Sequence, residues 1–186
     1  MNKVKILLLT AGLSFFSTFA LADSKVLMET SLGKIEIELD TKNAPITTQN
    51  FLDYVNSGYY DGLIFHRVIP QFMIQGGGAD SELNFKATNP PIQNEANNGL
   101  KNDRGTIAMA RTPAVDSATS QFFINVADND SLNYKSPANY GYAVFGKVIN
   151  GMDVVDKIVN VETDRKGPHA NVPVDPIYII KASVVE

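Results

Sequence analysis

The stretch FHRVIPQFMIQGGG, residues 65–78, carries the side chains that are best suited to chemistry. Arg67 lies among Phe, Val and Ile, and a long charged side chain is seldom buried without a partner. From these residues two roles remain open, a structural ion pair or a donor directed at a ligand. Strand alternation places Phe65 on the side of Arg67, and Met73 and Gln75 have the same parity. Phe72 has the opposite parity, so it reaches the same pocket only if the chain is irregular just before it.

His66 is the more obvious candidate for acid–base chemistry, but the sequence gives it no partners. A hydrolase would need a nucleophile such as Ser120 and an orienting acid such as Asp61, and the GxSxG turn that often presents the serine is absent. Neither His66 nor His169 has further ligand-type residues at the spacing of a metal site. We therefore expect no metal, and a buried His66 whose ring nitrogens bond to the backbone.

Two neighbouring patterns are also informative. The three glycines at 76–78 lack the Lys-Ser/Thr pair and the helix of a phosphate-binding loop, so they predict a turn or a close backbone approach. In SQFFIN, residues 120–125, Gln121 precedes two phenylalanines that face opposite sides of a strand. One ring can therefore point away from the core, although a strand buried on both sides would give the same pattern.

The first 22 residues form the pattern of a secretory signal peptide. Lys3 and Lys5 precede an apolar run, and Ala20-Leu21-Ala22 is an A-x-A cleavage site. The run is short for a membrane-spanning helix, and no positive stop follows it. We expect cleavage after Ala22, export, and a mature domain over residues 23–186 that has no membrane segment.

Composition narrows the class of the mature domain. The whole chain has a net charge of −4, and two of its 16 basic residues lie in the leader. Without a basic stripe such a domain is a poor match for nucleic acid. The absence of cysteine excludes disulfides, thiol catalysis and cysteine-bound metals. An exported chain without disulfides is compatible with a periplasm.

The periodicity predicts a mostly β domain. GKIEIELD, residues 33–40, alternates cleanly as a half-buried antiparallel strand, and residues 26–30 form its hairpin partner. Two helices are expected, at 43–57 with Asn43 as a cap and Gly58 as its end, and at 152–159. About eight strands with two isolated helices indicate a closed eight-stranded antiparallel β-barrel that the helices cap. The other predicted strands are 63–68, 72–75, 106–110, 121–126, 142–149 and 177–185.

Four motifs together resemble the cyclophilin-type peptidyl-prolyl cis-trans isomerases: FHRVIPQFMIQGG, GTIAMAR, SQFFIN and YAVFGKVINGMDVVDKI. They occur in the family's order, and the resemblance covers residues 25–186, with short loops similar to the exported bacterial branch. It implies the same eight-stranded barrel with two helices. It also implies a periplasmic monomer that needs no cofactor and isomerises proline-containing unfolded or partly folded exported polypeptides.

The resemblance assigns a role to Arg67. In cyclophilins the arginine of the FHR motif is the main catalytic residue, which implies that Arg67 acts here with Phe72 and Gln75. The positions that match substrate-binding residues are Met73, Ala110, Arg111, Gln121, Phe123, Leu132 and Tyr142.

Three positions depart from the family pattern. Ser131 stands where many eukaryotic members have tryptophan, and that tryptophan matters for binding cyclosporin, so weak cyclosporin binding is expected. Tyr142 replaces a histidine but keeps an aromatic wall. Arg111 replaces a residue that is often asparagine, so its backbone is the safer match. The rival function is a peptide-binding holdase that uses the groove without catalysis, which a proline isomerisation assay would distinguish.

Overall fold

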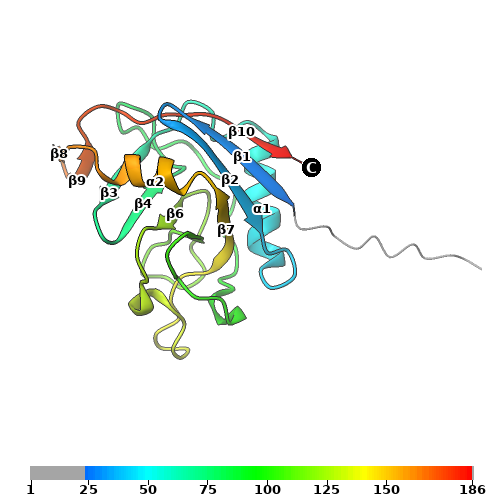
Figure 1. Ribbon diagram of the computed structural model, residues 1–186. Helices are drawn as coiled ribbons and strands as arrows, with labels where there is room; N and C mark the ends of the chain where they lie inside the picture. Colours follow the sequence, from blue (N-terminus) through cyan, green and yellow to red (C-terminus); the bar gives the residue numbers. More distant parts are fainter. Residues whose placement is uncertain (1–23, 186) are drawn as a thin grey trace, which may run out of the picture.

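The computed structural model describes residues 24–185, and both the leader and its expected cleavage site lie outside this range. One curled sheet dominates the fold, and its eight strands are all antiparallel to their neighbours (Figure 1). The order across the sheet is β10-β1-β2-β7-β5-β6-β4-β3. The bounds are β1 Lys25–Thr30, β2 Gly33–Leu39, β3 Phe65–Ile69, β4 Met73–Gly76, β5 Thr106–Met109, β6 Phe122–Asn125, β7 Val144–Asn150 and β10 Ile179–Val185.

The alternating strand β2 pairs with β1 as the predicted hairpin. Its side chains Ile35, Ile37 and Leu39 are fully buried, whereas Lys34 is exposed. On the same side of the sheet, Phe51 packs against Tyr60, Phe122 and Phe145 with ring centroids 5.2–5.7 Å apart. This apolar filling of the concave side forms the main core.

Both predicted helices are present. Helix α1 spans Pro45–Asn56 and packs against β7 and β10, and it ends before Gly58, whose φ of 66° suits glycine. Helix α2 spans Met152–Val159, as predicted, and packs against β2, β3 and β4. Two short 3-10 turns, Ala96–Asn98 and Asp130–Leu132, lie in the long loops. Among residues 24–185, no helix is long and apolar enough to cross a membrane.

The prediction of a closed barrel is wrong, because the sheet is an open, curled half-barrel. Its edge strands β10 and β3 form no ladder, and the chain segments before them meet at one isolated bridge between Ile64 and Tyr178. The edge of β3 is covered instead by a hairpin that the sequence did not predict, β8 Thr163–Lys166 with β9 His169–Pro173. This hairpin lies beyond β3 at the left of Figure 1. An edge that is covered in this way needs no closure.

Candidate active site

The strands β3 and β4 meet at a sharp turn that decides which side chains reach one pocket. Phe72 N–H bonds to the Ile69 carbonyl at 3.2 Å, and Gln71 has a positive φ of 59°. Proline at the second position of a turn and a positive φ at the third are the geometry of a type II turn. The irregularity that Phe72 requires is therefore present, and Phe72 and Met73 both line the pocket.

A β-bulge in β3 changes the side to which one of its predicted side chains points. Phe65 pairs with Gly76 and Arg67 pairs with Gln75, so two residues of β3 oppose one of β4. The extra residue is His66, and a bulge of this kind changes which way the following side chains point. As a result Phe65 is fully buried in the main core, whereas Arg67 is only partly buried and faces the pocket, although both had the same predicted side.

A cavity of about 120 Å³ lies on the convex side of β3, β4 and β6. Every residue that lines it belongs to the predicted site, and only Gln121 of that site lies outside the lining. The lining residues are Arg67, Phe72, Met73, Gln75, Ala110, Arg111, Phe123, Leu132 and Tyr142. The structure therefore brings together side chains from five separate segments of the chain.

The base of the cavity is apolar and belongs to a small second core. Met73, Ala108, Phe123 and Val144 are buried together, and the Phe123 ring meets Tyr142 edge-on at 5.7 Å. Phe122 points the other way into the main core, so the two-sided strand predicted from SQFFIN is confirmed, with one ring directed at the pocket. A wall of this kind suits a small apolar ring.

On the polar side of the cavity, a chain of hydrogen bonds joins Arg67 and Gln75 to Gln121, which lies outside the lining. Arg67 Nη1 donates to Gln75 Oε1 at 3.3 Å, and Gln75 Nε2 donates to Gln121 Oε1 at 3.0 Å. None of the ion pairs within residues 24–185 involves Arg67. Of the two roles left open, the structural ion pair is therefore excluded in the described part of the chain, and the guanidinium faces the cavity as an uncompensated cation.

Arg111 is the second guanidinium in the lining. Its Nε donates to the Gly141 carbonyl at 2.9 Å, and its Nη1 donates to the carbonyls of Thr112 at 2.9 Å and Pro113 at 3.3 Å. The guanidinium carbon lies 4.7 Å from the centre of the Tyr142 ring. Its side chain, which the sequence left as the weaker match, is thus held against the pocket wall.

His66 is buried, with 6% of its surface exposed, as expected. The predicted backbone bonding is wrong for one nitrogen, because Nδ1 has no hydrogen-bond partner. Burial, followed by the charges of His169 and Arg67, lowers the pKa of His66 from 6.5 to about 4. No triad forms, since Ser120 Oγ bonds to the Tyr59 hydroxyl at 3.3 Å and Asp61 Oδ1 accepts from the Ala182 N–H. The arrangement does not support a hydrolase.

A second cavity, of about 400 Å³, lies on the other side of Arg67 and Gln75. The unpredicted β8–β9 hairpin forms one wall of it with His169 and Asn171, and Phe85 packs between His66 and His169 with ring centroids 5.6 and 5.7 Å away. The signal for this wall in the sequence is only the short turn KGPH, residues 166–169.

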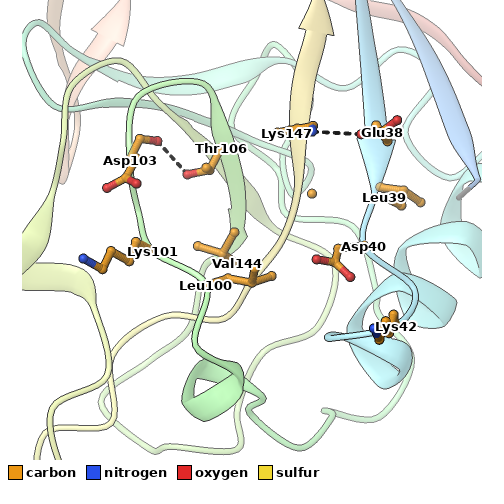
Figure 2. A pocket seen from close by; sticks show the side chains of 11 residues that line it. Glu38, Leu39, Asp40, Lys42, Leu100, Lys101, Asp103, Thr106, Val144 and Lys147 are labelled. Atoms are coloured by element: carbon orange, nitrogen blue, oxygen red, sulfur yellow. Dashed lines mark hydrogen bonds and ion pairs between the residues drawn. The ribbon is translucent and has the colours of Figure 1, made fainter.

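A further cavity of about 420 Å³ opens at the end of β2 (Figure 2). Lys147 of β7 pairs with Glu38 of the neighbouring strand β2 at 3.1 Å, and both residues line the cavity with Leu100 and Val144. Val144 also belongs to the second core that contains Phe123, and Leu100 packs against that core. No predicted site residue lines this cavity, so it is separate from the site. Within residues 24–185, no cluster of three His, Cys, Asp or Glu could hold a metal ion.

Comparisons with known proteins agree with this geometry. The family model described as cyclophilin type peptidyl-prolyl cis-trans isomerase/CLD matches residues 25–184. Peptidyl-prolyl cis-trans isomerase A of Dickeya dadantii is 56% identical over 183 residues, which cover 98% of this chain and 95% of that protein. Peptidyl-prolyl cis-trans isomerase B of Escherichia coli is 55% identical and covers 87% of this chain and 99% of its own length.

Solved structures give the same result. The crystal structure of a Cryptosporidium parvum cyclophilin type peptidyl-prolyl cis-trans isomerase in the presence of the dipeptide Ala-Pro has a TM-score of 0.73 and 29% identity, and it covers 87% of this chain and 99% of that chain. With the fold, the lining of the first cavity and relatives of this identity in agreement, the chain belongs to the cyclophilin-type peptidyl-prolyl cis-trans isomerases and is an enzyme of that activity.

Proposed function

We propose that this isomerase accelerates rotation about X-Pro bonds of exported polypeptides by donating an Arg67 N–H to the prolyl nitrogen. One observation carries the proposal: within residues 24–185, Arg67 has no carboxylate partner and faces a small cavity with an apolar base. Its remaining N–H groups are therefore available to a substrate, and Gln75 holds one of them in place at 3.3 Å. A guanidinium stays charged at any physiological pH, so it donates without losing a proton.

The reaction explains why a fixed donor is sufficient. Amide resonance gives the bond a rotation barrier of roughly 18–20 kcal/mol. At the top of that barrier conjugation is lost, so the proline nitrogen becomes pyramidal and gains a lone pair. A donor aimed at that nitrogen stabilises the twisted state and not the planar one, which is the requirement for raising a rate. No bond is made or broken, so the site needs neither a nucleophile nor a metal.

The apolar wall supplies the other part of the effect. Phe72, Met73 and Phe123 would hold the pyrrolidine ring, and Leu132 and Tyr142 close the far side of the same cavity. Exclusion of water strengthens the interaction of the guanidinium with the lone pair. A rate enhancement of about 10⁴ requires about 5.4 kcal/mol, which one oriented charged donor and a positioned ring can supply.

Replacement of Arg67 tests the mechanism. Arg67→Ala should lower kcat/KM by about 10² to 10³, as for other single donors directed at a transition state. Arg67→Lys should also lose most activity, because an ammonium lacks the planar fork that Gln75 orients. The measurement is exchange NMR of a short X-Pro peptide series, with Arg104→Ala as the control because Arg104 pairs with Asp156 away from the cavity. A folded Arg67→Ala protein that retains the wild-type rate would contradict the mechanism.

Export to a periplasm and a role in folding form the second part of the proposal. The leader pattern over residues 1–22 supports export, and the clients would then be proline-containing exported chains that are unfolded or partly folded. Cell fractionation, with mass spectrometry of the mature protein, should find it in the periplasm and beginning at Asp23. Recovery of the uncleaved chain from the cytoplasm would contradict this assignment.

Weak cyclosporin binding and a monomeric state complete the proposal. Ser131 is exposed beside Leu132 at the edge of the cavity, where its short side chain offers no aromatic surface. We expect calorimetry to give a much weaker affinity for cyclosporin than that of a relative with tryptophan at this position, and light scattering to give the mass of one chain.

An aggregation assay with the Arg67→Ala protein separates catalysis from a holdase function, because a holdase would suppress aggregation fully without Arg67.

A further inference from the structure

Arg111 is held by contacts that leave part of its guanidinium unused. Three backbone carbonyls accept from Nε and Nη1, and the Tyr142 ring lies against the guanidinium carbon at 4.7 Å. Within residues 24–185, Nη2 donates to no protein acceptor, and no carboxylate forms an ion pair with Arg111. The side chain is thus pre-organised while one nitrogen remains free to donate.

The two cavities around Arg67 and Arg111 are lined by basic residues, although the protein as a whole is acidic. The chain carries 20 acidic and 16 basic residues, yet neither the first cavity nor the second has Asp or Glu in its lining. The same two cavities share Arg67, and the second adds His66 and His169. Among residues 24–185, the two cavities therefore present two guanidinium groups and no carboxylate in their lining, and a ligand that brings a carboxylate would provide the counter-charge.

We propose that Arg111 is a specificity residue that selects substrates with an acidic side chain close to the isomerised proline. The inference rests on the proposed function, because it takes the first cavity as the site of the proline ring. Arg111 and Arg67 line that one cavity, so a carboxylate bound by Arg111 must come from a residue near the proline. An extended chain advances about 3.3–3.6 Å per residue, which limits the distance to one or two residues.

The size of the expected preference for Glu over Gln follows from the solvent exposure of the ion pair between Arg111 and the substrate carboxylate. Arg111 is only partly buried, so an ion pair with a substrate carboxylate stays partly screened. A preference of about fivefold for Glu over Gln is the upper end for such a pair, and the fixed guanidinium favours that end because less side-chain freedom is lost on binding. The preference should fall towards one in about 1 M salt, where the screening length is about 3 Å.

The test uses four pairs of peptides that differ only by Glu or Gln, placed one or two residues before or after the proline. Exchange NMR gives kcat/KM for each peptide after subtraction of its uncatalysed rate, and the Glu/Gln ratio is compared within each protein variant. We expect a ratio of about five for at least one position in the wild type. Arg111→Gln should bring the ratio close to one, and Arg111→Lys should give an intermediate ratio because it keeps the charge and loses the fixed geometry.

Arg104→Gln is the matched control, since it removes an equal charge from a residue that lines neither cavity, and it should keep the wild-type ratio. A wild-type ratio of one for all four pairs would overturn the proposal, as would an Arg111→Gln protein that keeps the wild-type ratio. If Arg111→Gln does not fold, the salt series decides, because a ratio that is unchanged in 1 M salt excludes an ion pair. A wild type that isomerises neither peptide of any pair would instead refute the proposed function.

Discussion

Gln75 joins Arg67 to Gln121 by two hydrogen bonds. Its Oε1 accepts from Arg67 Nη1 at 3.3 Å, and its Nε2 donates to Gln121 Oε1 at 3.0 Å. The orientation of the guanidinium is therefore set by neutral amides instead of a carboxylate. A carboxylate at the same place would hold the guanidinium equally well but would also cancel its charge. In the proposed mechanism, the amide keeps the charge available for the prolyl nitrogen, which is the group that a twisted X-Pro bond presents.

Gln75→Glu tests this requirement with almost no change of shape. We expect kcat/KM to fall by about 10², because an ion pair would neutralise the donor and the new side chain cannot donate to Gln121. Since the guanidinium would lower the pKa of the introduced carboxyl, acidification to pH 5 should not restore the rate. Gln49→Glu, at an exposed position of helix α1 that lines none of the cavities beside Arg67 and Arg111, is the control. An unchanged kcat/KM for Gln75→Glu would show that the charge of Arg67 is not used.

Gly78 lies beside Gln121, the last side chain of this hydrogen-bond network. A Cβ at Gly78 would lie 2.6 Å from Gln121 Cγ, so an alanine there must displace the Gln121 side chain. Displacement breaks its bond to Gln75, and we expect Gly78→Ala to lower kcat/KM about tenfold through misplacement of the donor. Side-chain amide resonances of Gln75 and Gln121 should shift in the NMR spectrum.

The double variant Gly78→Ala/Gln121→Ala is the control for the clash itself. It removes the atom that the new methyl group meets, so it should recover the melting temperature lost by Gly78→Ala while activity stays low. Recovery of full activity in the double variant would mean that Gln121 has no part in orienting Arg67.

Part of the site could be predicted because its residues lie on strands β3 and β4, whose parity is visible in the sequence. Met73 and Gln75 share a side with Arg67, and Phe72 was placed in the pocket only on condition of an irregular turn, which Gln71 provides with its φ of 59°. The resemblance to the family supplied the residues after β5, those at and just before β6, and those in the loop before β7. These are local features, so the sequence alone records them.

Two wrong predictions, the side of Phe65 and the closure of the barrel, have a common cause. Each feature depends on contacts between segments that are distant in the sequence. Phe65 was placed on the side of Arg67, but the bulge at His66 adds one residue and reverses the parity, which a pattern of period two cannot reveal. Closure of the barrel was expected from strand number, yet the β8–β9 hairpin covers the edge of β3. Its strands are short and polar, so they carry no strong strand pattern.

His66 should make stability depend on pH. Its pKa is about 4 in the folded chain, whereas an unfolded histidine titrates near 6.5, so the unfolded chain binds the proton first as the pH falls. The free energy of unfolding should be constant above about pH 6.5 and then decrease towards pH 4, by up to about 3 kcal/mol. Urea unfolding between pH 4.5 and 7.5 measures this slope.

His66→Gln should flatten that slope, whatever its effect on absolute stability. His169→Gln should keep most of it, because burial is the main cause of the lowered pKa and the charge of His169 is second. Parallel curves for wild type and His66→Gln would show that another group causes the acid sensitivity.

Glu95 caps helix α1 from a distant part of the chain, a role that the sequence assigned to Asn43. Its carboxylate accepts from the N–H groups of Ile46 at 3.1 Å and Thr47 at 2.8 Å, and from the Thr47 hydroxyl at 2.6 Å. Asn43 instead bonds to Asp40, and the residue at the N-cap position, Ala44, has no side chain that can cap. A carboxylate at this end also interacts favourably with the helix dipole.

We therefore expect Glu95→Ala to lower the free energy of unfolding by about 1–2 kcal/mol, the usual range for loss of a cap. Glu95→Gln should lose less, because an amide oxygen can still accept one N–H bond but carries no charge. Urea unfolding gives the difference, and Glu82→Ala, an exposed carboxylate whose side chain accepts no hydrogen bond within the described residues, is the control. Because Glu95 lines none of the cavities around Arg67, kcat/KM per folded molecule should stay at the wild-type value. Equal stabilities for Glu95→Ala and Glu82→Ala would show that helix α1 holds its first turn without this contact.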